Sequence, residues 1–120
     1  MSQMKVDELA LWLEHGFGCT LLDVRRARAR DDDGTAIAGA RWLDPALWLD
    51  WKDGVATDRP AVLYCAHGHE ISQGLVAALR AMGVDARHLE GGISAWKGAG
   101  LPVQALQARQ PLQPAARPAP

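Results

Sequence analysis

Apolar side chains follow two different spacings along the chain, and the spacing changes from one segment to the next. Residues 6–14 place apolar side chains at helical intervals and are followed by Gly16 and Gly18, so they predict a helix. The uninterrupted apolar runs at residues 19–24 and 61–64 are typical of buried strands. Residues 71–82 return to helical spacing and stop at Gly83.

The remaining segments are shorter. The Asp44-Pro45 pair is typical of a helix start, with a capping carboxylate before a proline at the first helical position. The charge-rich residues 25–33 are expected to form a solvated loop. The other expected elements are a turn and short strand within 37–43, a short helix over 46–51, a strand over 85–89, a turn at Gly91-Gly92 and a short helix over 93–97.

Strands that alternate with helices at short intervals predict an α/β fold with a mainly parallel sheet, covered by helices on both faces. The composition changes after Pro102. Residues 103–120 are rich in Gln, Ala and Pro and can bury little surface. We therefore expect one domain over residues 1–102 and a flexible C-terminal tail over residues 103–120.

Composition narrows the class of protein. With 48% hydrophobic and 22% charged residues and a net charge of −1, the chain of 120 residues has no basic surplus for nucleic acid or an anionic membrane. No apolar run approaches the roughly 20 residues of a membrane span, and the acidic N-terminus is unlike a signal peptide. We expect a cytoplasmic protein. Of the two cysteines, Cys19 is expected to be a small buried apolar residue, and no Cys or His spacing predicts a metal site.

Cys65 is the strongest candidate for chemistry. It ends the apolar run 61–64 and is followed by a short loop and then a predicted helix. Backbone N–H groups and the helix dipole favour an anion at such a helix N-terminus. This placement can lower a thiol pKa from about 8.5 to roughly 3.5–7.5, so Cys65 is a candidate nucleophile.

A loop curled around the Cys65 sulfur would form an anion-binding concavity that suits two reactions. The thiolate could attack a phosphate ester, or it could attack a sulfane sulfur and become a persulfide. Cysteine-dependent phosphatases and the related arsenate reductases need an arginine six residues after the cysteine, and Ile71 stands there. If the helix begins at Ile71, the loop after Cys65 is also one residue shorter than in those phosphatases. A smaller cradle around a single sulfur favours sulfur transfer.

Four segments, in their order and spacing, resemble a single-domain rhodanese, a thiosulfate or persulfide sulfurtransferase. They span nearly all of residues 5–102. The segments are Leu21-Leu22-Asp23-Val24-Arg25, Ile37-Ala38-Gly39-Ala40, Val62-Leu63-Tyr64-Cys65-Ala66-His67-Gly68 and Leu89-Glu90-Gly91-Gly92-Ile93-Ser94-Ala95-Trp96.

The resemblance implies a five-stranded parallel sheet and a Cys65 persulfide that needs no metal or organic cofactor. The sulfur donor would be thiosulfate or a persulfide, and the acceptor cyanide or a thiol, including a protein thiol. A non-catalytic module that senses redox state or binds a partner is the alternative. Arg25 is expected either to contact substrate or to pair with an acid. The other expected substrate-binding residues are Ala66, His67, Gly68, His69, Glu70 and Ile71.

Glu70 departs from the common pattern, in which a basic or small hydroxyl residue ends the loop. A carboxylate there repels thiosulfate and raises the Cys65 pKa, although protonated His67 and His69 could offset this effect. We predict weak thiosulfate:cyanide activity that increases in Glu70→Lys or Glu70→Arg, measured as a lower thiosulfate KM. An unchanged KM in both variants would show that this electrostatic account is wrong.

Overall fold

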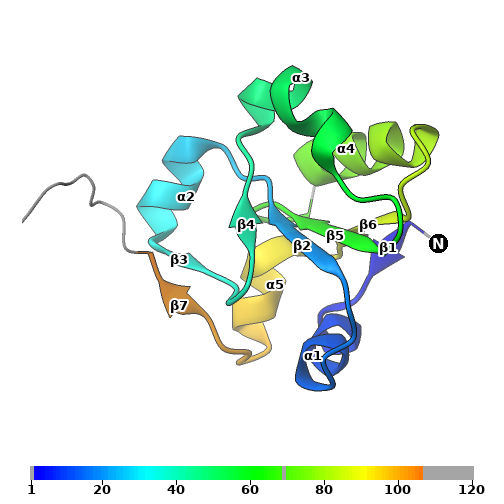
Figure 1. The fold of residues 1–120 in the computed structure, drawn as a ribbon. Helices are drawn as coiled ribbons and strands as arrows, with labels where there is room; N and C mark the ends of the chain where they lie inside the picture. The colour runs from blue at the N-terminus through cyan, green and yellow to red at the C-terminus, as the bar shows by residue number, and fades with distance from the viewer. Residues whose placement is uncertain (1, 69, 107–120) are drawn as a thin grey trace, which may run out of the picture.

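The sheet at the centre of the molecule confirms the expected α/β architecture (Figure 1). The computed structural model describes residues 2–68 and 70–106, without the side chain of Glu70. Neighbouring strands in the five-stranded sheet are all parallel. Their order is β1 (Gln3–Met4), β6 (Ala86–Leu89), β5 (Ala61–Tyr64), β2 (Thr20–Asp23) and β4 (Arg41–Trp42).

Helices cover both faces of this sheet, as Figure 1 shows. On one face lie α3 (Trp48–Trp51), flanked by the 3-10 turns η1 (Pro45–Leu47) and η2 (Lys52–Gly54), and α4 (Glu70–Ala81). On the other face lie α1 (Val6–Glu14) and α5 (Gly92–Gly98), while α2 (Ala27–Asp33) contacts β3 (Thr35–Ala36). Within the described ranges, no helix has the length and apolar character needed to cross a membrane.

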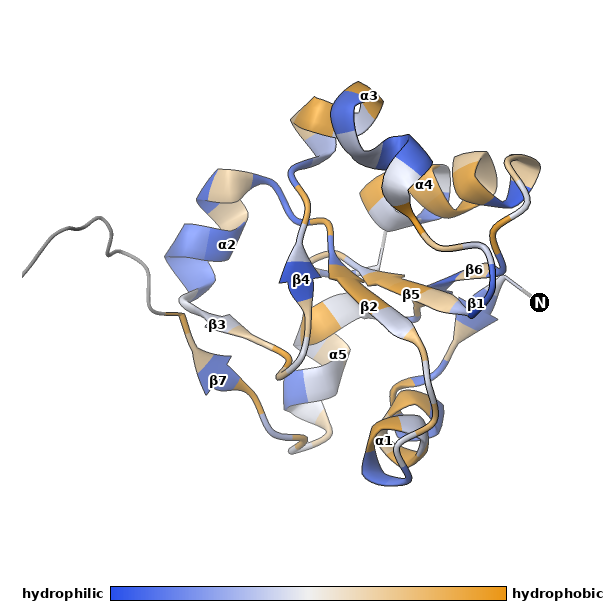
Figure 2. Cartoon of the chain, viewed as in Figure 1, coloured by the Kyte–Doolittle hydropathy of each residue, from blue (hydrophilic) through white to orange (hydrophobic). Residues whose placement is uncertain are grey.

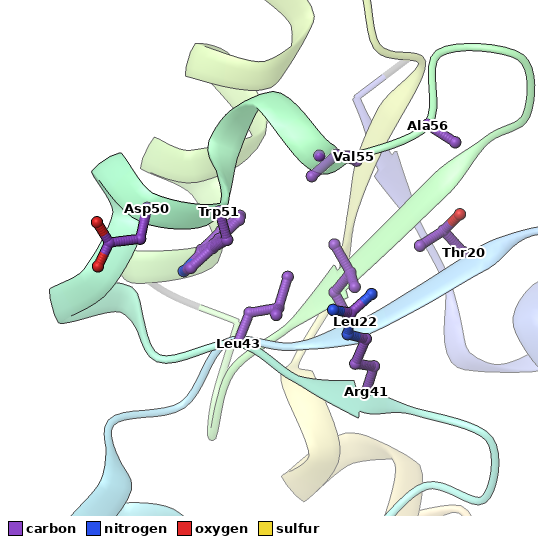
Figure 3. A pocket seen from close by; sticks show the side chains of 9 residues that line it. Thr20, Leu22, Arg41, Leu43, Asp50, Trp51, Val55 and Ala56 are labelled. Carbon is purple, nitrogen blue, oxygen red and sulfur yellow. The ribbon is translucent and has the colours of Figure 1, made fainter.

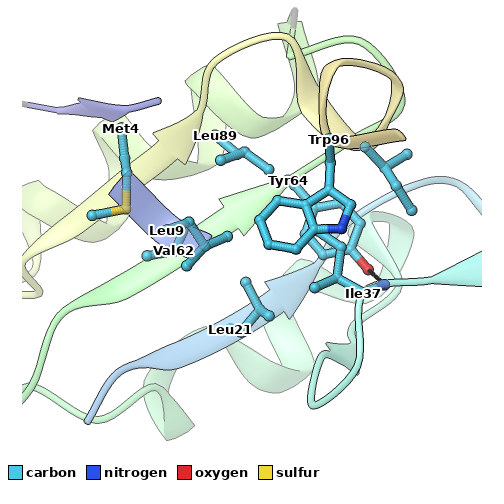
Figure 4. Packing of buried hydrophobic residues seen from close by; sticks show 9 residues of the cluster. Met4, Leu9, Leu21, Ile37, Val62, Tyr64, Leu89 and Trp96 are labelled. Atoms are coloured by element: carbon cyan, nitrogen blue, oxygen red, sulfur yellow. Dashed lines mark hydrogen bonds between the residues drawn. The ribbon is translucent and has the colours of Figure 1, made fainter. Parts of the chain in front are cut away.

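Two hydrophobic clusters result from the alternation of side chains along the strands. Leu21, Val62 and Tyr64 face α1 and α5, where Leu9, Ile93 and Trp96 complete one cluster (Figure 4). Leu22, Leu63 and Ala86 face the other way and pack with Val76 and Leu79 of α4. The apolar colouring of β2 and β5 in Figure 2 reflects this burial on both faces, which the continuous apolar runs had predicted.

The ends of β2 and β5 define the position of the site. Asp23 pairs with Tyr64, so Arg25 and Cys65 both leave the sheet at the same edge. After β2 the chain reaches β4 on one side of the sheet, and after β5 it reaches β6 on the other side. The strand order therefore reverses between β2 and β5, and parallel α/β sheets form crevices beyond the carboxyl ends of strands at such a point.

Residues 25–33 are not the loop that their charge predicted, because residues 27–33 form α2. Alanines at 27 and 29 favour a helix, and Arg28 and Asp32 are four residues apart, with 3.9 Å between Nε and Oδ2. Gly34 ends the helix in the left-handed region with φ 73°. The charges are thus arranged along a helix, which brings Asp33 next to α5.

The first residues of the expected tail pack against the domain instead. β7 (Gln104–Ala105) pairs antiparallel with β3, and the Leu106 amide donates to the Gly34 carbonyl at 2.9 Å. Val103 packs against the cluster around Trp96, whose Nε1 donates to the Pro102 carbonyl at 2.8 Å. The boundary at 102 therefore lies too early, and residues 107–120 of the expected tail lie outside the described residues.

We predict that two truncations separate these parts. Ending the chain after Pro102 removes the β3–β7 pairing and the Val103 contact, and should lower the free energy of unfolding by about 1–2 kcal/mol. Ending it after Leu106 should leave that free energy unchanged, because it removes only the Pro-, Ala- and Gln-rich residues. Urea denaturation of both chains tests this, and equal stabilities would refute it.

Candidate active site

Cys65 lies at the base of a pocket beyond the carboxyl ends of β2 and β5. Its side chain is 6% exposed. The pocket has a volume of about 520 Å³ and is open to solvent between α2 and the loop that follows β5. Its lining is mainly apolar, with two arginines and one histidine. The lining residues are Arg25, Arg26, Ala29, Cys65, Ala66, His67 and Ile71.

The carbonyl groups of the loop are held by the start of α5. The Cys65 carbonyl accepts from the Ile93 amide and the Ala66 carbonyl from the Ser94 amide, both at 3.0 Å. A trans peptide is planar, so the N–H of the next residue points opposite to each carbonyl. The amides of Ala66 and His67 therefore point away from α5, and the pocket around Cys65 has no α5 residue in its lining.

Two glycines permit this contact between loop and helix. Gly68 has φ 73°, and a Cβ there would lie 2.6 Å from the Gly91 nitrogen. Gly92 has φ 63°, and a Cβ there would lie 2.4 Å from the Cys65 carbonyl oxygen. Both positions need a left-handed conformation and a close approach of two backbones. Both positions therefore require glycine for their backbone conformation and for the space around their Cα atoms.

The first turns of α4 hold the loop from the other side. Ser72 is fully buried, and its Oγ lies 3.3 Å from the Cys65 Sγ. The next residue, Gln73, donates from Nε2 to the Gly68 carbonyl at 2.8 Å. No sequence motif singles out Ser72 as a residue that contacts the sulfur. The feature that could have identified it is its position seven residues after Cys65, on the face of α4 that turns to the sheet.

Arg25 forms part of the pocket wall, but its guanidinium is largely engaged within the protein. Nε and Nη2 donate to the two carboxylate oxygens of Asp23 at 3.0 and 2.7 Å, and Nη1 donates to Asp33 at 3.1 Å. Nη2 also donates to the Thr35 carbonyl at 2.7 Å. Burial alone would lower the pKa of Arg25, but the hydrogen bonds and charge of Asp23 raise it above its ordinary value. The pairing role proposed for Arg25 is thus present, and a contact with substrate stays a prediction.

Asp33 connects α2 to α5 across the mouth of the site. Burial would raise the pKa of its carboxyl, but hydrogen bonds from Lys97 and Thr35 lower that pKa to about 2. A second hollow of about 410 Å³ continues from the Cys65 pocket along this contact. Arg25, Ala29, Ala66 and His67 line both hollows, and Ser94 and Lys97 line only the second.

The structure brings most of the predicted site residues to one place. Cys65, Ala66, His67, Ile71 and Arg25 line the pocket, whereas Gly68 lies behind the loop against the Gly91-Gly92 turn. His69 and the side chain of Glu70 lie outside the described residues, so their roles stay predictions. In the part of the chain that is described, no group of three or more His, Cys, Asp or Glu side chains could hold a metal ion.

Another pocket, of about 360 Å³, lies between β2, β4 and the segment from α3 to residue 56 (Figure 3). Its charged lining residues are Arg41 and Asp50, and Trp51 forms one wall. Cys65 is not part of its lining. The candidate nucleophile Cys65 therefore lies in the pocket beyond β5 and not in this one.

The sequence model of the rhodanese-like domain matches residues 5–99. The chain belongs to the rhodanese-like domain family. This range contains every element from α1 to α5, together with the Cys65 loop and the Gly91-Gly92 turn that supports it.

One curated protein is similar in sequence, and solved structures are similar in fold. The Mycobacterium tuberculosis protein named "probable adenylyltransferase/sulfurtransferase MoeZ" is 39% identical over 92 residues, which cover 74% of this chain and 23% of MoeZ. The chain thus spans about a quarter of the length of this curated relative. A rhodanese-like domain protein from Staphylococcus aureus is 27% identical, with a TM-score of 0.71 over 80% of this chain and 91% of its own. A rhodanese-related protein from Thermoplasma volcanium is 24% identical, with a TM-score of 0.75 over 87% and 98% of the two chains.

The close contact at Gly92 predicts a strong effect of a single methyl group. Gly92→Ala should lower the free energy of unfolding by more than about 2 kcal/mol, because the new Cβ meets backbone atoms in a left-handed conformation. Gly74→Ala in α4 is the matched control, since a Cβ there has nothing within 4 Å and alanine favours a helix. Thermal and urea denaturation measure both effects. Equal stabilities of the two variants would contradict the importance of this contact.

Proposed function

We propose that the protein is a sulfurtransferase that accepts a sulfane sulfur on Cys65 and passes it to a thiol or to cyanide. The observation that carries the proposal is the position of Cys65, in a pocket beyond the sheet edge, beside a loop whose carbonyls are bound by α5. We assign the amides of Ala66 and His67, which point away from α5, as donors to an anionic sulfur at Cys65. Membership of the rhodanese-like family and the similarity to a protein named as a probable sulfurtransferase support the same reaction class.

The pocket favours an organic persulfide over thiosulfate as the sulfur donor. Ala29, Ala66 and Ile71 give the lining an apolar character that suits the carbon chain of an organic donor. Arg25 is directed to Asp23 and Asp33, and Arg26 and His67 are the other charged or titratable residues among the described ones that line the pocket. A dianion such as thiosulfate would meet the Arg26 guanidinium in the lining, but not a free guanidinium of Arg25, which is already paired with two carboxylates.

The proposed reaction consists of two sulfur-transfer steps at Cys65, which hydrogen-bond donors of the protein assist. The Cys65 thiolate attacks the outer sulfur of the donor, a new S–S bond forms, and the donor's S–S bond breaks with its electron pair on the departing thiolate or sulfite. An acceptor thiolate or cyanide then attacks the outer sulfur on Cys65, and Cys65 leaves as a thiolate. Such thiol chemistry fits the cytoplasm, and Cys19 and Cys65 are not joined by a disulfide.

Intact-mass measurement tests the proposal. After treatment with cysteine persulfide the protein should gain the mass of one sulfur atom, and a thiol or cyanide should remove it. Cys65→Ser should abolish the adduct. Cys19→Ser is the control and should retain it, because Cys19 packs beside α1 and outside the pocket.

The same measurement tests the preference for an organic persulfide over thiosulfate. The adduct should form faster with cysteine persulfide than with thiosulfate at equal concentration, and the reverse order would contradict the role of the apolar lining. The absence of an adduct with every donor would overturn the sulfurtransferase proposal and favour a non-catalytic binding or redox-sensing module.

A further inference from the structure

Ser72 is a polar side chain of α4 that contacts the Cys65 sulfur. It is the third residue of the helix, it is fully buried, and its Oγ lies 3.3 Å from the Cys65 Sγ. A buried hydroxyl group needs a hydrogen-bond partner, and the cysteine sulfur is the one this geometry provides.

The direction of this hydrogen bond depends on the state of the sulfur. When Cys65 is a thiol, either group can donate. When Cys65 is a thiolate, the sulfur has no proton, so only the hydroxyl can donate. Hydrogen bonds that involve an ionised group are stronger than neutral ones, so the contact gains strength as the sulfur becomes charged.

The surroundings hold the Ser72 hydroxyl in this position. A serine inside a helix can donate to the carbonyl four residues earlier, which here is Gly68. That carbonyl already accepts from Gln73 Nε2 at 2.8 Å. Further along α4, Val76 and Leu79 are buried against the sheet and fix the rotation of the helix. The first turns of α4 thus hold the loop through Gln73 and contact the sulfur through Ser72.

We propose that Ser72 is a catalytic hydrogen-bond donor to the Cys65 sulfur, which it stabilises whenever that sulfur bears negative charge in the transfer cycle. The proposal rests on the sulfurtransferase function proposed above. In sulfur uptake the hydroxyl stabilises the attacking thiolate before the new S–S bond forms. In sulfur release the acceptor thiolate bonds to the outer sulfur, the bond between the two sulfurs of the Cys65 persulfide breaks, and its electron pair stays on Sγ. Ser72 then donates to the sulfur that leaves.

The effect is largest in the release step. A donor that stabilises the free thiolate increases the fraction of ionised Cys65 but also lowers its reactivity as a nucleophile, and these two effects partly cancel during uptake. During release Cys65 is the leaving group, and stabilising its charge accelerates the reaction. Loss of the hydroxyl should therefore slow release more than uptake.

The first test measures the ionisation of Cys65 without any sulfur donor. In Ser72→Ala, which removes only the oxygen atom, the midpoint of the pH profile for alkylation by iodoacetamide should move upward by about one pH unit. Ser72→Thr keeps a hydroxyl and should restore a midpoint near that of the parent protein. A purely structural role of Ser72 would not move the midpoint. An alanine midpoint equal to that of the parent would overturn the proposal, whether or not the threonine variant folds.

The second test follows sulfur release by single-turnover mass spectrometry. Preloaded Cys65 persulfide should pass its sulfur to a small thiol about tenfold more slowly in Ser72→Ala than in the parent protein. An equal rate would contradict the role in release. If the parent protein itself forms no persulfide, the proposed function fails, and the alkylation profile still decides whether Ser72 stabilises the thiolate.

Discussion

The close contact between the Cys65–Gly68 loop and the Gly91-Gly92 turn is the constraint on which the rest of the site depends. Carbonyls of the loop bind the first amides of α5, and two glycines allow the backbones to meet. Because each peptide is planar, fixing a carbonyl also fixes the direction of the following amide. The contact therefore orients hydrogen-bond donors at the cysteine without a charged side chain. It also joins the segments that follow β5 and β6 at the carboxyl ends of these strands.

A network of charges holds the opposite wall. Asp23 ends β2 and binds Arg25, which reaches Asp33 at the end of α2, and Asp33 in turn binds Lys97 of α5. Asp23 and Arg25 are each 1% exposed, so removal of either partner would deprive the other buried charge of its two side-chain hydrogen bonds within this pair. The network connects β2 and α2, which are neighbours in sequence, to α5, which is distant from both. Arg25 therefore forms part of the pocket wall while its guanidinium is hydrogen-bonded to other residues of the protein.

The sequence predicted the strands well, because burial on both faces leaves a continuous apolar run. β5 begins and ends where the apolar residues do, and the Cys65 loop follows directly. Helix α2 was missed because its stabilising features are not apolar spacing: alanines, a charge pair four residues apart and a left-handed glycine cap. The strands β1 and β7 have two residues each, too few to form a pattern, and pairing with distant strands defines them.

In the site, too, features set by residues close in sequence could be predicted, and contacts between distant residues could not. Cys65 and Gly68 were recognisable because the strand, the loop and the glycine are close in sequence. The partners of Arg25 could not be assigned, since Asp33 approaches it only when α2 forms. Helical spacing alone does not reveal that Ser72 lies on the face of α4 that turns toward the sulfur. Predicting that contact needs the packing of Val76 and Leu79 on the sheet, which sets the rotation of the helix.

The kinds of donor at the site agree with the charge of the group that they would bind. A persulfide or thiolate bears at most one negative charge, whereas a phosphate ester or its transition state bears about two. Backbone amides and a serine hydroxyl carry no net charge and do not titrate near neutral pH. Such donors stabilise a single charge without requiring a counterion, and they are in place both when sulfur arrives and when it leaves. An arginine clamp would instead favour the more highly charged anion. Ile71 in the pocket lining, together with the engagement of Arg25 by acids, therefore argues for the same reaction class as the position of Cys65.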